Sequence, residues 1–222
     1  MRKALIELCS SNPTRAAKVL DLGPKQTELI AVNARLASAP CAPAIEIYSG
    51  VLYDALDFET LPASARKRAD SRVLISSALF GFVRPHDLIP AYRLSGDCTL
   101  PPLGPLASMW REPGQAVLAS TTGVIVDLRS GAYAKLAPLS SELSHRGCVA
   151  RVLLEKNGKR SVVSHHNKAT KGRLIREVLR TSGVARSLDD LVPYLADIGF
   201  TAELHRDLSG GIPRLDVIVG EN

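Results

Sequence analysis

The chain has 222 residues, of which 45% are hydrophobic and 23% charged, and a formal net charge of +6 at pH 7. These are ordinary values for a globular protein, so we do not expect extensive disorder, and the length suits one domain with a sizeable core. Aromatic residues make up only 5% of the chain, which argues against the broad base-stacking surfaces of single-strand nucleic-acid binders.

The four cysteines predict reduced, partly buried thiols rather than disulfides or a metal site. Cys9, Cys41, Cys98 and Cys148 are far apart, and none belongs to a CxxC or Cys/His ligand pattern. The chain contains no apolar run of about 18 residues that would span a membrane, and its start does not resemble a secretory signal. We therefore expect a cytoplasmic protein, most simply a monomer, with no membrane contact, no metal and no cofactor.

The first half of the chain predicts mainly helices, followed by one buried strand. Helical patterns are seen at 2–9, 13–22, 25–38 and, in an otherwise ambiguous segment, from about Gly50 to 57. The apolar run 72–76 is typical of a buried strand, and the Gly- and Pro-rich residues 77–94 predict a loop. The pattern at 2–9 has no N-cap residue, which suggests that a segment is missing upstream.

The second half alternates between strands and helices. It predicts a helix at 103–111, a strand at 123–128, a hairpin of 148–155 with 160–165, helices at 168–181 and 187–198, and a closing hairpin of 200–205 with 215–219. Asn157-Gly158 is a strong hairpin signal, and Ser187-x-x-Asp190 resembles a capping box. The pattern indicates a mixed α/β fold, residues 1–222 forming a single compact domain with a mixed sheet flanked by helices.

The positive charge of the chain is concentrated at a strand-to-helix junction. Between residues 159 and 186 there are eight Lys or Arg and one acid, a net +7, so the rest of the chain is close to neutral. Unpaired backbone N–H groups at the helix start, near Lys168 to Lys171, add partial positive charge and favour a phosphate ligand. The alternative interpretation is a solvated basic helix face without a ligand.

Polar side chains follow three predicted strand ends, at 76–93, 127–133 and 165–173. Ligands of such sheets bind beyond the carboxyl ends of the strands. If the strands are neighbours, one basic cleft would collect the following residues: Arg84, Arg93, Asp127, Arg129, His165, Lys168, Lys171 and Arg173. The basic members would hold phosphate, and Asp127 or His165 would be the candidates for acid/base chemistry.

Several signatures of known chemistry are absent, among them GxGxxG, GxxxxGK[ST], HExxH and GxSxG. His165 and His166 are adjacent, and neighbouring residues on a strand point to opposite faces, so they do not form a metal site together. Asp127 has a second interpretation as well, since a carboxylate paired with Arg129 or Arg151 needs no catalytic role.

Five separated segments together resemble the peroxide-stress protein YaaA family. They occur in matching order over nearly the whole chain, at residues 48–56 (YSGVLYDAL), 77–87 (SALFGFVRPHD), 89–94 (IPAYRL), 126–133 (VDLRSGAY) and 163–173 (VSHHNKATKGR). The resemblance implies a compact α/β domain with a positively charged cleft. Carried over by motif, the cleft residues are Arg84, Arg93, Lys168, Lys171 and Arg173.

The resemblance also implies protection from hydrogen peroxide by limiting unincorporated iron and the DNA damage it causes. Some family members resemble DNA-binding proteins through a helix-hairpin-helix-like element, which corresponds to Ser77–Gly81 here. Ala78 replaces the first Gly of that element, so a positive φ at this position would be strained. Relatives begin with an additional strand and a short loop that this chain does not match, and we expect that segment to be missing.

Three functions follow from these observations. The first is a stress-protection protein that binds DNA through backbone phosphates, with strong salt dependence and little sequence preference. The second is an enzyme acting on a nucleobase or nucleotide, with Asp127 or His165 in acid/base roles. The third is a basic domain that binds an acidic protein. The first is favoured.

Overall fold

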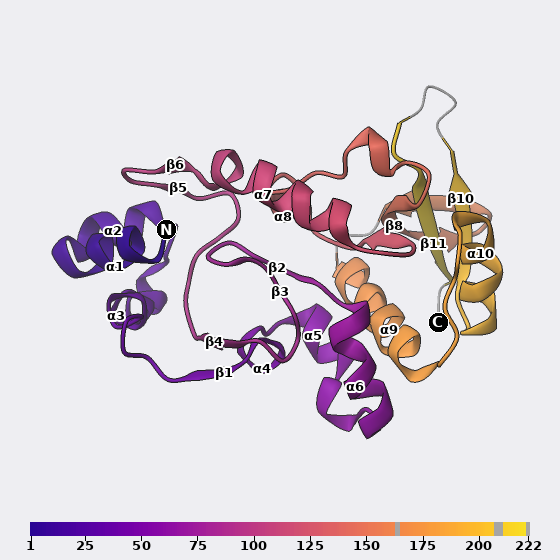
Figure 1. The fold of residues 1–222 in the computed structure, drawn as a ribbon, viewed down its shortest axis with the longest axis horizontal. Coiled ribbons are helices and arrows are strands. Elements are labelled where there is room, and N and C mark those ends of the chain that lie inside the picture. The colour runs from indigo at the N-terminus through magenta and orange to yellow at the C-terminus, as the bar shows by residue number, and fades with distance from the viewer. Residues whose placement is uncertain (163–164, 207–210, 221–222) are drawn as a thin grey trace. The chain divides into compact units, whose positions relative to one another are not determined.

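A computed structural model describes residues 1–162, 165–206 and 211–220 (Figure 1), excluding the side chains of His165 and His166. Helices and a mixed sheet make up the described residues, which confirms the predicted mixed α/β class. The chain divides into two compact units. Unit 1 comprises Met1–Ile47, Val73–Leu118 and Arg129–Pro138, and unit 2 comprises Tyr48–Arg72, Ala119–Leu128 and Leu139–Asn222. The expectation of a single domain stays a prediction.

Unit 1 contains helices and short two-stranded ladders. Its helices are α1 (Arg2–Ser11), α2 (Pro13–Val19), η1 (Pro24–Gln26), α3 (Glu28–Ala34), α4 (Ala44–Ile47), most of α7 (Leu106–Ser120), and α8 (Gly131–Ala134). Its strands pair antiparallel as β1 (Cys41–Pro43) with β4 (Leu88–Pro90), β2 (Ile75–Ser77) with β3 (Gly81–Val83), and β5 (Thr99–Leu100) with β6 (Gly104–Pro105).

Leucines of α1 and of the residues that follow α2 and α3 contribute to the core of unit 1. Leu5, Leu20 and Leu36 are each at most 2% exposed and pack with Leu100 and Leu106. α2 begins where local signals predicted, since the Asn12 side chain accepts a hydrogen bond from the Arg15 backbone N–H at 2.9 Å. Pro13 follows at the first helical position, where its missing N–H costs nothing.

Several expectations for unit 1 are wrong in detail. The helix expected at 25–38 is divided into η1 and the shorter α3, and the strand expected at 72–76 is β2, Ile75–Ser77. Residues 77–94 are not a loop throughout, because they contain β3 and β4. Strands of three residues are too short to show a period, so only their partners reveal them. The helix expected at 103–111 begins at Leu106 and continues to Ser120 in spite of Pro113. The following Gly114 lies where an added Cβ would be 2.4 Å from the Ala137 Cβ, so this face of the helix approaches its neighbour closely.

Unit 2 contains the mixed sheet and the longest helix of the described residues. Its helices are α5 (Val51–Leu56), η2 (Phe58–Thr60), α6 (Ala63–Arg72), η3 (Ser141–Leu143), α9 (His165–Arg180) and α10 (Leu188–Asp197). Its strands are β7 (Ile125–Asp127), β8 (Gly147–Lys156), β9 (Lys159–Val162), β10 (Thr201–His205) and β11 (Arg214–Gly220).

The sheet of unit 2 has the order β10-β11-β8-β7, with β9 paired to the last residues of β8. β8 is parallel to both β7 and β11, while β9 and β10 are antiparallel to their partners. The Asn157-Gly158 hairpin is confirmed, and both turn residues have positive φ, 51° and 71°. The closing hairpin and the Ser187 capping box are confirmed as well.

One face of β8 forms the core of this unit. Cys148, Ala150 and Val152 alternate along the strand and pack with Leu188, Leu195 and other residues of α10 and β11. α9 lies against α5 and α6 in the same unit (Figure 1). The strand expected at 160–165 ends at Val162, residues 163–164 lie outside the described residues, and His165 begins α9.

Candidate functional site

The motif segments 48–56 and 163–173 meet in unit 2, although more than 100 residues separate them in sequence. α5 carries the first and the start of α9 carries the second, and the contact between these helices is close. At Gly172 an added Cβ would lie 2.1 Å from the Leu52 carbonyl oxygen and 3.0 Å from the Ala55 Cβ. Only glycine allows this approach, so the two motifs form one structural feature.

Arg176 fastens α9 to the end of α5. Its Nη1 donates to the carbonyl oxygens of Leu56 at 2.8 Å and Asp57 at 2.6 Å, and its Nη2 donates to Thr60 Oγ1 at 2.8 Å. The last carbonyls of a helix have no partner within the helix, so a guanidinium at this position satisfies them. The charge of Arg176 therefore serves the fold.

Two arginines of α6 stabilise the C-terminal end of α9 in the same way. Arg68 donates to the carbonyl oxygens of Leu179 and Arg180, both at 2.9 Å. Arg72 donates to the carbonyl oxygens of Val178, Thr181 and Ser182 at 2.7 to 2.8 Å. Cations at this end also offset the negative end of the helix dipole. The C-terminal half of the basic helix is thus committed to structure.

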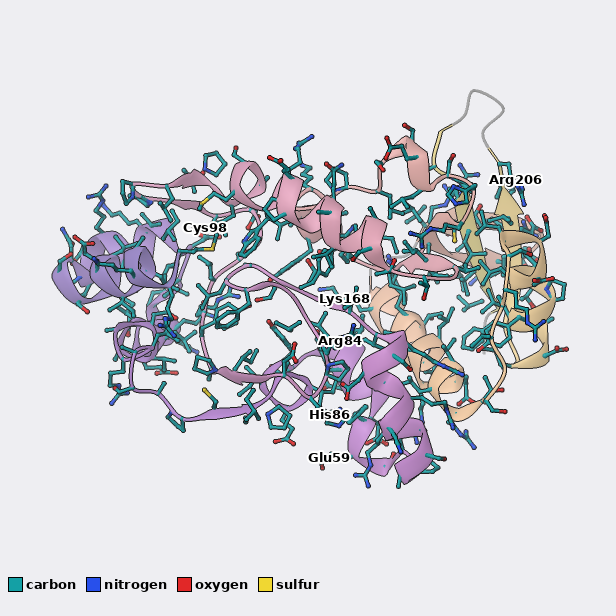
Figure 2. All side chains as sticks on the ribbon, in the orientation of Figure 1. Glu59, Arg84, His86, Cys98, Lys168 and Arg206 are labelled. Atoms are coloured by element: carbon teal, nitrogen blue, oxygen red, sulfur yellow. The ribbon has the colours of Figure 1, made fainter. Side chains whose placement is uncertain are left out.

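The first two turns of α9 differ from the rest of the helix. Lys168 is exposed and lies near the N-terminal end of α9 (Figure 2), and Arg173 is exposed one turn further along. Thr170 and Lys171 between them are buried, at 1% and 8% exposed. The segment therefore offers two solvent-facing cations and one buried amine beside the unpaired N–H groups of a 16-residue helix.

Lys171 and Asp127 are both buried and interact electrostatically. Asp127 ends β7 and is 6% exposed. Burial lowers the pKa of the Lys171 ammonium below its ordinary value, and the negative charge of Asp127 opposes that shift. The thiol of Cys148 on the neighbouring strand has its pKa raised to about 12 by burial and by the same carboxylate.

Asn167 contributes a polar atom that sequence reasoning did not single out. Its Oδ1 is buried and has no hydrogen-bond partner among the residues that the structure describes. Asn167 precedes Lys171 by four residues, so the two side chains share one face of α9. The four-residue spacing of Asn167 and Lys171 is visible in the sequence, but it does not show which face of the helix is buried.

The remaining candidates belong to unit 1 and lie in separate local settings. Arg84 is exposed in the turn after β3, where its backbone N–H donates to Asp87 Oδ2 at 2.7 Å. The backbone of Arg93 is held by Asn33, whose Nδ2 donates to the Arg93 carbonyl at 2.7 Å. Arg93 Nε is buried without a hydrogen-bond partner among the described residues.

Arg129 has structural contacts of its own. Its Nη2 donates to the Ala137 carbonyl at 2.8 Å, and its guanidinium lies 5.4 Å from the centre of the Phe82 ring. Arg151, the other arginine considered as a partner for Asp127, instead forms a two-pronged ion pair with Asp216 at 2.8 and 2.9 Å.

The structure thus brings together Asp127 and Lys171, with Lys168 and Arg173 on the same helix as Lys171. His165 begins α9, but its side chain lies outside the described residues. The convergence of these residues with Arg84, Arg93 and Arg129 in one basic cleft stays a prediction.

The segment Ser77–Gly81, expected to correspond to a helix-hairpin-helix-like element, links two strands. It forms the turn of the β2–β3 hairpin. The positive φ, 79°, falls on Gly81 rather than on Ala78, so the strain expected from Ala78 is not present. Gly81 packs against the Trp110 ring, where an added Cβ would be 2.7 Å from the nearest ring carbon.

The cysteines are free thiols, as expected. Cys9, Cys98 and Cys148 are buried, whereas Cys41 is exposed, so its predicted partial burial is wrong. Within residues 1–162, 165–206 and 211–220, no cluster of three or more His, Cys, Asp or Glu side chains has the geometry of a metal site. In the same part of the chain no helix is long and apolar enough to cross a membrane.

The fold and the site define a mixed α/β protein with a buried lysine and aspartate at the start of a basic helix. A family profile described as "Peroxide stress protein YaaA" matches residues 1–202. A UPF0246 protein of Streptomyces coelicolor is 43% identical over 220 residues, which is 98% of this chain and 84% of that protein. UPF0246 proteins of Corynebacterium efficiens and Corynebacterium glutamicum are 38% and 36% identical, over 92% and 90% of this chain and 82% and 80% of their own lengths. The chain belongs to the YaaA (UPF0246) family.

Proposed function

We propose that this protein protects cells from hydrogen peroxide by binding DNA through phosphate contacts and by helping to limit iron-dependent oxidative damage. The description of the matching family supports the stress role. The first two turns of α9 are the observation that supports phosphate binding. Exposed Lys168 and Arg173 add full charges to the partial charge of the helix start.

Binding of this kind depends on contacts to phosphates and not on contacts to bases. Backbone contacts carry little sequence information, and each neutralised phosphate makes the affinity more sensitive to salt. Five per cent aromatic residues leave few rings on which bases could stack. We therefore expect weak discrimination among sequences and a steep loss of affinity with salt.

The test is fluorescence anisotropy of the protein with duplex, bubble and single-stranded DNA at two salt concentrations. The variant is the double replacement Lys168→Ala and Arg173→Ala, which removes two exposed cations of α9. The matched control is Arg66→Ala with Lys67→Ala, which removes two exposed cations of α6. We expect at least a tenfold weaker affinity in the first variant and a smaller change in the control. Equal losses in both would show that only net charge matters and would overturn the assignment to α9.

The cellular role needs its own measurement. Cells without this gene should lose viability in hydrogen peroxide and contain more chelatable iron. The wild-type gene should restore both values, and the Lys168→Ala, Arg173→Ala gene should not. Restoration by that variant would separate peroxide protection from the proposed phosphate contacts.

A second candidate function is enzymatic, and the burial of Lys171 beside Asp127 favours it. Ionisable groups with shifted pKa values and specific charge partners are common in active sites. Asp127→Asn should then abolish turnover of a damaged nucleotide while leaving DNA affinity within about twofold. Unchanged turnover would remove Asp127 from the mechanism.

A further inference from the structure

Lys171 is buried in a way that a structural lysine rarely is. Its side chain is 8% exposed. Its ammonium is subject to desolvation and to the through-space negative charge of Asp127. Burying a charged amine is costly, so burial lowers the pKa of the Lys171 ammonium and makes its deprotonation easier.

Arg176 and Arg173 show by contrast what the other cations of α9 do. The guanidinium of Arg176 has three hydrogen-bond acceptors within 2.8 Å, and Arg173 extends into solvent. Lys171 lacks the acceptors of Arg176 in the described part of the chain, and at 8% exposed it is far more buried than Arg173. A neutral lysine amine in a partly desolvated site is the form that attacks carbonyl carbon.

The neighbours of Lys171 suit that chemistry. Asp127, a buried carboxylate, can accept the proton that the ammonium must lose and return it to the departing oxygen. Asn167 Oδ1, one turn before Lys171, is a buried acceptor without a partner in the described part of the chain. It is available to a hydroxyl of a bound molecule. These groups belong to α9 and to the carboxyl end of β7, where sheet proteins place ligands.

We propose that Lys171 is a nucleophile that forms an imine with the aldehyde of a ring-opened, base-free deoxyribose in DNA. The choice of substrate rests on the proposed function, because the exposed Lys168, three residues before Lys171 on α9, would hold a flanking phosphate. Base-free sugars are the DNA lesions that expose an aldehyde, and oxidative damage produces them.

The step is balanced without an oxidant, reductant or metal. Lys171 loses one proton to Asp127, and the Nζ lone pair bonds to the aldehyde carbon. The carbonyl oxygen takes up two protons, one from Nζ after the attack and one returned by Asp127, and leaves as one water molecule, so that the C=N bond of a protonated imine replaces C=O. Water reverses the reaction and releases the lysine.

The experiment uses reductive trapping. The 222-residue protein is mixed with a duplex containing one base-free site, and sodium borohydride reduces the imine to a stable secondary amine. The covalent complex is measured on a denaturing gel, and peptide mass spectrometry locates the modified lysine. Undamaged duplex is the substrate control, and the exposed Lys67→Met is the matched protein control.

We expect a cross-link with the base-free duplex, located at Lys171, and at most one tenth of it in Lys171→Met and Lys171→Arg. The arginine variant keeps the positive charge, so it separates the nucleophile from simple electrostatics, and circular dichroism shows whether each variant is folded. Asp127→Asn should slow the trapping several-fold. Cross-linking at other lysines, or undiminished cross-linking in Lys171→Arg, would overturn the proposal.

Two further arms separate this proposal from the proposed function. Anisotropy with the same base-free duplex measures binding alone, and binding without a cross-link overturns the imine proposal while the proposed function stands. Trapping with free 2-deoxyribose 5-phosphate tests the amine without DNA. Labelling of Lys171 by this sugar in a protein that binds no DNA would overturn the proposed function and support Lys171 as the reactive amine.

Discussion

Two buried aspartates of unit 2 illustrate how neighbours decide what a residue does. Asp216 on β11 is 2% exposed, and its carboxylate accepts hydrogen bonds from Nε and Nη2 of Arg151. Arg214 Nε and His205 Nε2 lie 3.2 Å from its oxygens. Asp127, by contrast, acts on a buried amine. The same residue type is therefore a structural ion-pair centre in one strand and a candidate proton acceptor in the other.

At the residue scale, Asp216→Asn should destabilise the protein in a pH-dependent manner. Burial alone would raise the pKa of Asp216, but the Arg151 hydrogen bonds and the charges of Arg151, Arg214 and His205 lower it overall. The stabilisation is then present above the unfolded pKa of about 3.9 and is lost as the pH falls through the lower folded value. We expect a cost of about 2 kcal/mol at pH 7.

Urea unfolding at pH 7 and in steps below pH 4 measures the difference in unfolding free energy between the wild type and Asp216→Asn. This difference should become smaller as the pH falls below 4. Asp189→Asn is the control, since this carboxylate is 85% exposed and binds Arg206 at the surface. Its replacement should cost less than about 1 kcal/mol. A cost for Asp216→Asn that is independent of pH would contradict the prediction.

At the scale of elements, the packing of α5 on α9 depends on one glycine. Gly172→Ala would place a Cβ 2.1 Å from the Leu52 carbonyl, so one helix must shift. Backbone is involved, and the shift also strains the Arg176 hydrogen bonds to Leu56 and Asp57. We expect a cost of about 1–3 kcal/mol, measured as a lower midpoint of thermal or urea unfolding.

Gly131→Ala provides the matched control for this prediction. Gly131 begins α8, and an added Cβ there would meet no atom within 4 Å. Because alanine loses less conformational freedom than glycine in a helix, the control should be neutral or slightly stabilised. If Gly172→Ala unfolds at the same midpoint as the wild type, α5 and α9 do not approach each other closely at Gly172.

The elements that were predicted well have signals confined to a few neighbouring residues. Asn157-Gly158 marks its hairpin, and Ser187 with Asp190 marks the start of α10. α6 was not predicted, because only Ala65 and Ala69 of its ten residues are buried and its sequence shows no apolar stripe. The two-residue strands β5 and β6 were missed because strands this short show no pattern in the sequence and are recognised only by their pairing with one another.

The sequence identified most candidate residues of the site, but it did not indicate which of them are buried. Asp127, Lys168, Lys171 and Arg173 were identified from strand ends and charge, and Asn167 was overlooked. The positive charges of Lys168, Lys171 and Arg173 look equivalent in the sequence. Burial separates them, and burial comes from α5, α6 and β7, which are distant along the chain.

At the scale of the whole molecule, the net charge of +6 should matter less than its distribution. Each phosphate neutralised contributes about −0.9 to the slope of log affinity against log salt for duplex DNA. Removing Lys168 and Arg173 should therefore reduce the magnitude of that slope by about 2. Removing Arg66 and Lys67 should leave it almost unchanged.

A titration of anisotropy over five or more salt concentrations provides the slopes. Parallel lines for the wild type and the α9 variant would mean that neither residue contacts a phosphate. Equal reductions in both variants would instead indicate a diffuse charge effect, because the field of a whole protein responds to its net charge wherever that charge lies.

The sequence by itself determined the family, the mixed α/β class and the concentration of charge around α9, because motifs, periodicity and composition are local properties. Only the tertiary structure decided the role of each charge. Arg176 stabilises the end of α5, Lys168 faces solvent, and Lys171 is buried beside Asp127. Desolvation and hydrogen bonding depend on which distant segments pack together, and those contacts exist only after the chain has folded.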